Sequence, residues 1–392
     1  MATRPRGICW TGSGRVGWGV FANTVLFGAT AALLTMTLVS AGPSPADLSP
    51  QRVVQRPLGL PPLPQPASDT QTTGRIALGR KLFFDPRLSA SGRMSCATCH
   101  VPAEAFTQTG RATPLGNASR PLRRNAPTLL NVAFVAPLMR DGSEPSLELQ
   151  VLAPLFDPAE MANPNFATLT ERLQAIPEYQ SAFAAVFEGT ASLGRIGDAI
   201  ASYERTLLSA NAPFDRWRFG RDENALSPAA KSGYALFNGK AGCSQCHVSA
   251  EVGGGILFTD HQMHNTGIGG VRSLARSRSS EIADAALDDR GRFEVTQKRD
   301  DLFKYRTPSL RNVALTAPYM HDGSLASLAD VVDWYDRGGE SSLGVDPLIR
   351  PLGLSQSEKR ELEIFLDSLT GDGLAELIEG ATSPAGRDKR RD

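Results

Sequence analysis

The sequence predicts a mostly α-helical protein made of two tandem modules that are joined by a helix and carry long loops. Three observations predict this architecture. A block of residues in the first half returns in the second, a five-residue cysteine motif occurs once in each half, and apolar residues elsewhere recur at helical spacing. With 392 residues, the chain is long enough for two domains that each bury a core.

The balance of charges on the chain does not favour nucleic acid as a partner. The chain has 41 basic and 41 acidic residues, so its net charge gives no reason to expect binding to nucleic acid. The function must therefore be sought in local sites.

The N-terminus has the pattern of an export segment. Arg4, Arg6 and Arg15 precede an apolar stretch, residues 16–41, that contains no charged residue. We expect residues 1–43 to be a signal peptide or an N-terminal membrane anchor, since the stretch is near the roughly 20 residues that span a bilayer. Either alternative delivers the rest of the chain outside the cytoplasmic membrane, which predicts a periplasmic protein.

Four of the five cysteines lie in two C-x-x-C-H motifs. These are Cys96-Ala97-Thr98-Cys99-His100 and Cys243-Ser244-Gln245-Cys246-His247. Two thiols on one turn can form thioethers with the vinyl groups of a haem, and the adjacent imidazole can ligate the iron. Zinc sites, disulfides and thioredoxin-like centres also use cysteine pairs, but none needs a histidine directly after each pair. The motifs therefore predict two covalently bound haems c, with His100 and His247 as iron ligands.

The two halves are copies of one unit. Residues 125–133 and 136–143 return with the same spacing as residues 306–314 and 317–324, and Gly79 to Phe83 has its counterpart in Gly233 to Phe237. We therefore expect cytochrome c-like haem domains at 71–213 and 214–374. A Pro-rich linker at 44–70 and a disordered tail at 375–392 complete the predicted organisation.

Helical periodicity is clearest in two segments. One contains Ile196, Ile200, Tyr203 and Leu207 and is expected to join the modules; the other contains Leu328, Val331, Val332 and Tyr335. The second copy also has a longer insertion between its haem motif and its repeated block, which glycines and charges mark as loop.

Equivalent positions of the two copies differ in one chemically important place. Glu148 of the first copy corresponds to Ala329 of the second. An iron that binds peroxide needs an open sixth position and a nearby acid-base group, which makes Glu148 a candidate. A solvated helix carboxylate is the plainer interpretation of the same residue.

The distal iron ligands remain open on the residues alone. No histidine lies between His100 and His247, so an open or weakly held sixth position is expected at the first haem. The candidate distal ligands are Met139 and Met161 for the first haem, and His261, Met263, His264, Met320, His321 and Tyr335 for the second.

At this point the sequence resembles the bacterial di-haem cytochrome c peroxidases together with the MauG-like di-haem enzymes. The resemblance runs from about residue 79 to residue 339. It is carried by both C-x-x-C-H motifs and by the segments 82–85 (LFFD), 124–127 (RNAP), 139–142 (MRDG), 158–161 (PAEM), 264–267 (HNTG), 307–312 (TPSLRN) and 318–323 (PYMHDG).

The resemblance implies a role for each haem. The first would react with peroxide and the second would receive electrons. Glu148 matches the family's distal acid-base glutamate, and Tyr335 falls where typical peroxidases have a methionine ligand and where the MauG-like branch has a tyrosine. A calcium ion between the haems would be held partly by the backbone carbonyls of Thr316 and Pro318.

The chain also departs from the typical peroxidases. The loop 101–123 lacks the histidine that caps the first iron in those enzymes, which predicts a first haem that needs no reductive activation. The tract around Leu129 and Leu130 lacks the tryptophan that lies between the haems in relatives, and Leu138 stands where a distal glutamine is often found.

We therefore expect a periplasmic di-haem peroxidase that reduces hydrogen peroxide with electrons from a small cytochrome c or copper protein. A MauG-like oxidase acting on a protein or organic substrate is the nearest alternative, favoured by Tyr335. A non-enzymatic electron carrier with two six-coordinate irons is the alternative from another class.

Overall fold

The computed structural model describes residues 57–64, 71–270, 289–340 and 343–382. These residues belong to one compact unit that begins at Gln55. The expected leader, residues 1–43, lies outside the described residues. Among the helices that the structure describes, none has both the length and the apolar character needed to cross a membrane.

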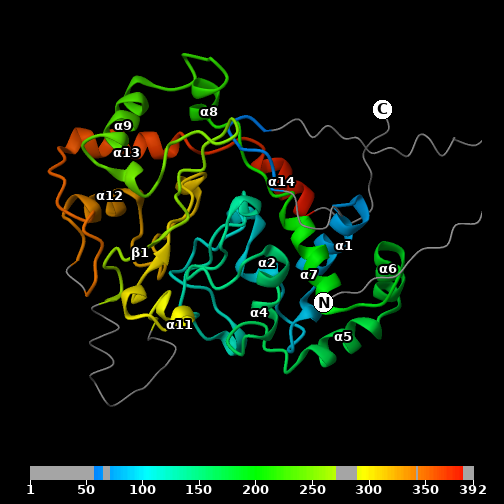
Figure 1. Cartoon of the computed structure of the whole chain (residues 1–392). Coiled ribbons are helices and arrows are strands. Elements are labelled where there is room, and N and C mark those ends of the chain that lie inside the picture. Colours follow the sequence, from blue (N-terminus) through cyan, green and yellow to red (C-terminus); the bar gives the residue numbers. More distant parts are fainter. Residues whose placement is uncertain (1–56, 65–70, 271–288, 341–342, 383–392) are drawn as a thin grey trace, which may run out of the picture. The chain divides into compact units, whose positions relative to one another are not determined.

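The prediction of a mostly helical protein is confirmed (Figure 1). Within the described residues, the sheet consists of β1 (Met263–His264) and β2 (Tyr305–Arg306), which pair antiparallel. The helices are α1 (Thr73–Phe84), α2 (Cys96–Cys99), α3 (Leu147–Gln150), α4 (Ala153–Phe156), α5 (Phe166–Gln174), α6 (Pro177–Phe187), α7 (Leu193–Glu204), α8 (Pro213–Arg218), α9 (Pro228–Asn238), α11 (Phe293–Thr296), α12 (Leu328–Asp336), α13 (Gln356–Asp367) and α14 (Leu374–Thr382).

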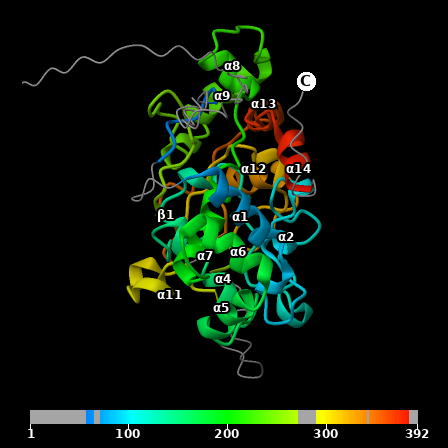
Figure 2. The ribbon, with the colours of Figure 1, turned by 90° about the vertical axis from the view of Figure 1, so that its right-hand side faces the viewer.

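The buried apolar residues gather in two main clusters. The first core cluster draws on α1, α3, α5, α6 and α7, and the second on α8, α9, α12 and α13. Figures 1 and 2 show α1 beside α7 in one region and α9 beside α13 in another. Each haem motif is contiguous with its own cluster, since Cys96 packs against the first and Cys243 against the second.

The repeated glycines explain how each helix pair approaches so closely. A Cβ atom on Gly79 of α1 would lie 1.7 Å from the carbonyl oxygen of Ala199 in α7. A Cβ atom on Gly233 of α9 would lie 2.0 Å from the carbonyl oxygen of Glu361 in α13. Both contacts are possible only without a side chain, so the duplicated glycine marks a duplicated helix crossing.

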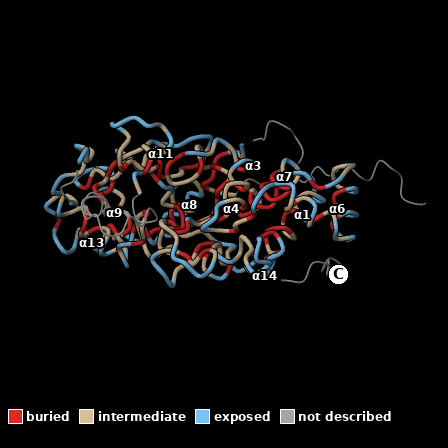
Figure 3. The backbone as a smooth tube through the Cα atoms, turned by 90° about the horizontal axis from the view of Figure 1, so that it is seen from below, coloured by how far each residue is buried: buried red, intermediate tan, exposed pale blue. Residues whose placement is uncertain are grey.

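The expected joining helix lies inside the first module. α7 packs on α1 and α3, and its residues Ile196, Ala199 and Ile200 are fully buried in the first core cluster (Figure 3). The helix ends at Glu204, and non-helical residues 205–212 lead to α8. Helical periodicity therefore identified α7 and α12 correctly as helices, but the connection between the modules, residues 205–212, is not helical.

The predicted tail is wrong over its first part. α14 occupies Leu374–Thr382, and its residue Ala381 is buried against the first core cluster. Arg80 of α1 donates to the carbonyl oxygens of Gly380 and Ala381, both at 2.9 Å. An apolar stripe of Leu374, Leu377 and Ala381 provides the burial that orders this helix. Residues 383–392 lie outside the described part.

The Pro-rich linker is also partly built into the fold. Leu60 is fully buried, and Gly59 forms a bridge with Gly255 of the second module. The buried guanidinium of Arg311 donates to the Gly59 carbonyl oxygen and makes two bonds, at 2.8 and 2.9 Å, to the carboxylate of Asp215. The side chains of this ion pair are 1% and 0% exposed, so it fastens the linker to α8 and the repeated block.

Replacing Asp215 should destabilise the protein strongly. Asp215→Ala would leave a buried guanidinium without its counter-charge, which costs about 3–5 kcal/mol of the free energy of unfolding. Chemical denaturation of the holoprotein measures this loss. Asp372→Ala is the control, because its pair with Arg216 is exposed and is worth about 1 kcal/mol or less. Equal stability losses in the two variants would contradict a special stabilising role for the buried ion pair of Arg311 and Asp215.

Candidate haem sites and the distal acid-base group

The first cysteine motif forms a short helix whose end presents the histidine. α2 spans Cys96–Cys99, and Ser95 and Thr98 form a capping box at its start. His100 follows, and its Nδ1 lies 3.1 Å from the carbonyl oxygen of Phe106. With Nδ1–H donating to that oxygen, Nε2 carries the lone pair that can ligate a metal.

The second motif repeats this arrangement. His247 Nδ1 lies 3.0 Å from the carbonyl oxygen of Phe258. A threonine follows each of these phenylalanines and donates a hydrogen bond to the repeated block of its module. Thr107 donates to the Ala126 carbonyl oxygen at 2.6 Å, and Thr259 donates to that of Thr307 at 2.7 Å. Burial lowers the pKa of both histidines, so both rings are neutral, as metal ligation requires.

The four cysteines suit thioether formation. All four thiols are free of disulfides. Burial raises the pKa of the Cys96 thiol, raises that of Cys99 to about 11 and raises that of Cys243 to about 12. These surroundings favour neutral sulfur, as in a thioether, over the thiolate that zinc binding or disulfide exchange would use.

Two arginines, the buried Arg306 and the partly buried Arg140, could hold the carboxylates of a haem. Arg140 donates to the side chain of Asn125, and Arg306 to the carbonyl oxygens of Met139 and Thr307. Arg140 Nε has no partner, and neither guanidinium forms an ion pair among the described residues. Burial lowers the pKa of each to about 10, and each guanidinium would gain from an anion. Haem propionates are anions of this kind.

Glu148 lies in the first turn of α3 and pairs with Arg205. Arg205 Nη2 is 2.5 Å from Glu148 Oε1, and the carboxylate side chain is 25% exposed. Burial raises its pKa, but a backbone N–H bond and the hydrogen bond and charge of Arg205 outweigh that effect and lower the pKa overall. Glu148 is therefore ionised at neutral pH and able to accept a proton.

The second module lacks this group although it keeps the local fold. Ser146 caps α3 and Ser327 caps α12 in the same way, each accepting from a backbone N–H three residues later. Ala329, at the position of Glu148, offers no proton acceptor. At this position the similarly capped helices thus carry a carboxylate in the first copy and an alanine in the second.

Among the candidate distal ligands of the second haem, Tyr335 lies in the electrostatic field of the haem cysteines. Burial raises its pKa, and the nearby Cys243 and Cys246 raise it further. His321 stacks on Tyr305 with ring centroids 3.7 Å apart. His261 has a buried Nδ1 without a hydrogen-bond partner.

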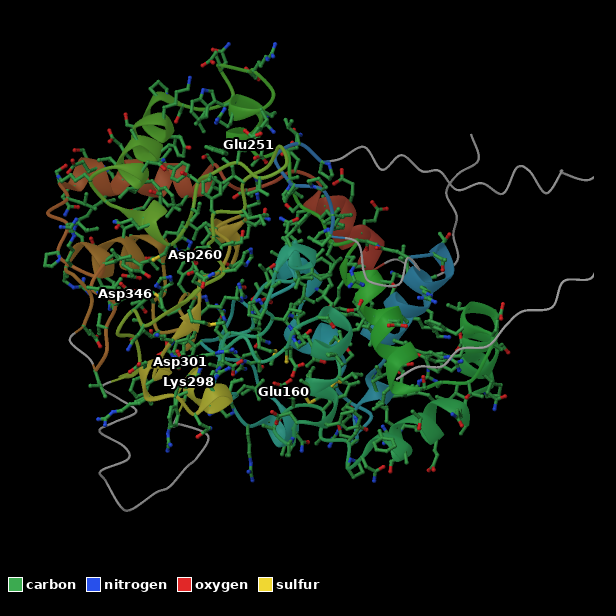
Figure 4. All side chains as sticks on the ribbon, in the orientation of Figure 1. Glu160, Glu251, Asp260, Lys298, Asp301 and Asp346 are labelled. Atoms are coloured by element: carbon green, nitrogen blue, oxygen red, sulfur yellow. The ribbon has the colours of Figure 1, made fainter. Side chains whose placement is uncertain are left out.

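His264 is poorly suited to ligate iron. Its Nδ1 is 2.7 Å from Asp346 and its Nε2 is 2.9 Å from Asp260, so both ring nitrogens face carboxylates (Figure 4 labels both aspartates). Where Cys246 is a free thiol, its hydrogen bond is the largest of the effects that raise the pKa of His264 to about 10. The hydrogen bonds of Asp346 and Asp260 also raise this pKa and do not depend on the state of Cys246. A protonated imidazole has no free lone pair for a metal.

The remaining sequence candidates are placed as follows. Met161 is buried, and Met139 Sδ accepts from Gln150 Nε2 at 3.5 Å. Thr316 directly precedes the cis peptide bond Ala317–Pro318, to which Pro318 belongs, and the counterpart of this bond in the first module, Ala136–Pro137, is also cis. Sequence reasoning missed Glu204 and Arg205, although both lie between Tyr203 and Leu207, the last two residues of the predicted helix face.

Comparisons with known proteins agree on one family. A family model described as di-haem cytochrome c peroxidase matches residues 73–223. The chain is 37% identical over 360 residues to the methylamine utilization protein MauG of Methylorubrum extorquens, covering 91% of this chain and 93% of that protein. It is 38% identical over 331 residues to cytochrome-c peroxidase IdrP1 of Pseudomonas sp. (strain SCT), covering 79% and 84%.

A solved structure extends the agreement to the fold. A MauG-like protein associated with microbial copper homeostasis superposes with a TM-score of 0.70 at 33% identity, covering 82% of this chain and 96% of that one. The family implies two haem c groups, in accord with the two histidine and cysteine sites described above. The chain belongs to the di-haem cytochrome c peroxidase family, which also contains the MauG proteins.

Proposed function

We propose that this protein is a periplasmic peroxidase that reduces hydrogen peroxide to water with electrons from a small cytochrome c or copper protein. Peroxide would bind on the side of the first haem opposite His100. Electrons would enter through the second haem, held by His247 and Tyr335. The observation that carries the proposal is the ionised Glu148 of the first module, paired with Arg205 and replaced by Ala329 in the second.

Glu148 has the properties that the reaction requires of a protein side chain. Reduction of peroxide would require a proton to move from one of its oxygens to the other as the O–O bond breaks, and the ionised carboxylate of Glu148 could accept and return that proton. Arg205 fixes the direction of that carboxylate and keeps it charged. The haem, when bound, supplies the iron that binds peroxide and the electrons that reduce it.

The other elements of the proposal rest on sequence and family. Cys96, Cys99, Cys243 and Cys246 would attach the haems. The carbonyl oxygens of Thr316 and Pro318 would contribute to a calcium site between them. The leader would deliver the protein to the periplasm, either cleaved or as an anchor.

The test is to add hydrogen peroxide to the fully oxidised holoprotein in the presence of a reduced small cytochrome c. Rapid oxidation of the cytochrome without prior reduction of the protein would support the proposal. It would also support the expectation that the first haem needs no reductive activation, which follows from the lack of a histidine in the loop 101–123. A protein inert to peroxide, with spectra free of high-spin features, would instead be an electron carrier.

Glu148→Gln should abolish most of the peroxide turnover. The amide keeps the size of the side chain but cannot take up the proton, so kcat should fall by roughly 10²- to 10⁴-fold. Steady-state oxidation of the reduced cytochrome measures this effect. Glu144→Gln, which changes a carboxylate four residues earlier, is the control and should retain activity. Full turnover by Glu148→Gln would refute the assigned role.

A MauG-like oxidase is the second candidate function. Its supporting observation is Tyr335, which lies near Cys243 and Cys246, the two cysteines of the second motif. Such an enzyme would store two oxidising equivalents across both haems and modify a protein or organic substrate. A long-lived state with both haems oxidised beyond the ferric level, and little turnover of cytochrome, would favour it.

Tyr335→Met should raise the reduction potential of the second haem. A phenolate-like ligand stabilises ferric iron more than a thioether does, and axial ligands span roughly 0.8 V in total. Spectroelectrochemical titration of the holoprotein should show one haem shifted by a sizeable part of that span and the other unchanged. Tyr234→Phe, within the aromatic cluster of the second module, should shift neither potential. An unshifted Tyr335→Met variant would remove Tyr335 from the ligand set.

A further inference from the structure

Glu204 is a buried carboxyl group to which the proposed reaction has so far given no role. It is the last residue of α7, it is 4% exposed, and its Oε2 has no hydrogen-bond partner. A carboxylate in that position would lack the bonds that normally stabilise a buried charge. The neutral, protonated acid is therefore the form that the surroundings favour.

Glu204 lies next to the acid-base pair of the first module. The following residue, Arg205, binds Glu148. α7 and α3 pack closely, because a Cβ atom on Gly197 would lie 2.5 Å from the Glu148 carbonyl oxygen. Glu148 acts on Glu204: burial raises the pKa of Glu204 to about 8, the charge of Arg205 lowers it in part, and the charge of Glu148 raises it further.

Glu204 also lies near the attachment point of the first haem. After burial, its charge is the largest influence that raises the pKa of the Cys96 thiol. The titratable groups that face Glu204 are thus Arg205 and Tyr203 on its own helix, Glu148 on α3 and Cys96 on α2. Arg205 is the one cation among these, and its guanidinium is engaged by Glu148.

The two glutamates are driven to opposite protonation states. Glu148 is held ionised by Arg205, whereas Glu204 keeps its proton through burial. Pairs of titratable groups whose surroundings push their pKa values apart are a recurrent basis for dividing acid and base roles. Here the acid and the base lie on two helices that pack together beside one haem motif.

We propose that Glu204 stores one of the protons consumed by peroxide reduction and releases it to the peroxide side through Glu148. The inference rests on the proposed function. Reduction of one hydrogen peroxide breaks one O–O bond, takes two electrons from the donor protein and takes two protons, giving two waters. Glu204 acts through Glu148 and is a supporting residue, since no contact with peroxide is assigned to it.

The first measurement is infrared spectroscopy of the holoprotein. A protonated buried carboxyl gives a separate C=O stretching band, which the Glu204→Gln variant should lack. In the wild-type protein the band should be present near pH 7 and should disappear as the pH rises through about 8. A band that is absent near pH 7, or identical in the variant, would overturn the proposal.

The second measurement is the pH profile of peroxide turnover. Glu204→Gln cannot supply a proton, so kcat should fall by about tenfold or more while KM and the haem spectrum stay unchanged. In the wild-type protein kcat should decline as the pH rises above about 8, and the variant should not show this decline. Glu160→Gln is the matched control, because Glu160 is another carboxyl near Cys96 whose pKa burial raises to about 7 (Figure 4 labels it).

The controls separate this inference from the proposed function. Equal kcat values and pH profiles in Glu204→Gln and Glu160→Gln would overturn the proton store while peroxide turnover itself remained established. A wild-type protein that does not turn over peroxide would refute the proposed function and, with it, the role of Glu204 in peroxide reduction.

Discussion

The two sites depend on one hydrogen bond each, from a histidine ring to a backbone carbonyl. His100 is held by Phe106 and His247 by Phe258, so neither ring can turn without losing its bond. The direction of Nε2 is therefore set by the loop after the cysteine motif. In each module a threonine of that loop donates a hydrogen bond to the repeated block. The repeated block thus helps to hold the histidine in place, although it lies far from the cysteine motif in the sequence.

The two modules share this arrangement, but the charged and titratable side chains near their cysteine motifs differ. The first module has an ionised glutamate, an arginine and a protonated glutamate close to its motif. Next to Cys246, the second has His264 between Asp260 and Asp346, which contact both of its ring nitrogens. The first motif is thus accompanied by a buried carboxyl group whose Oε2 has no partner, whereas the titratable side chains beside the second are paired with one another. This difference agrees with a division between a reactive site and an electron-entry site.

The sequence predicts the helices and the haem motifs because the patterns that indicate them are local. The cysteine motifs, the repeated block and the helical spacing in α7 and α12 each depend on neighbouring residues. The buried Leu60, the packing of α14 and the Arg311 to Asp215 clamp depend on contacts between residues more than 90 positions apart, which no local pattern reveals. Glu204 was missed for a related reason: in sequence it is one charged residue beside another, and its burial without a partner appears only after folding.

Helix geometry explains how adjacent residues acquire such different roles. Successive side chains on an α-helix point about 100° apart, so residues 204 and 205 at the end of α7 face different surroundings. Arg205 reaches Glu148 at the partly exposed edge of α3, while Glu204 points into the apolar interior near Cys96. The ion pair keeps its charges where solvent helps to stabilise them, and the neutral acid occupies the place where a charge would be costly. The end of α7 thus supplies both the arginine that keeps Glu148 ionised and the buried Glu204, whose surroundings favour the protonated form.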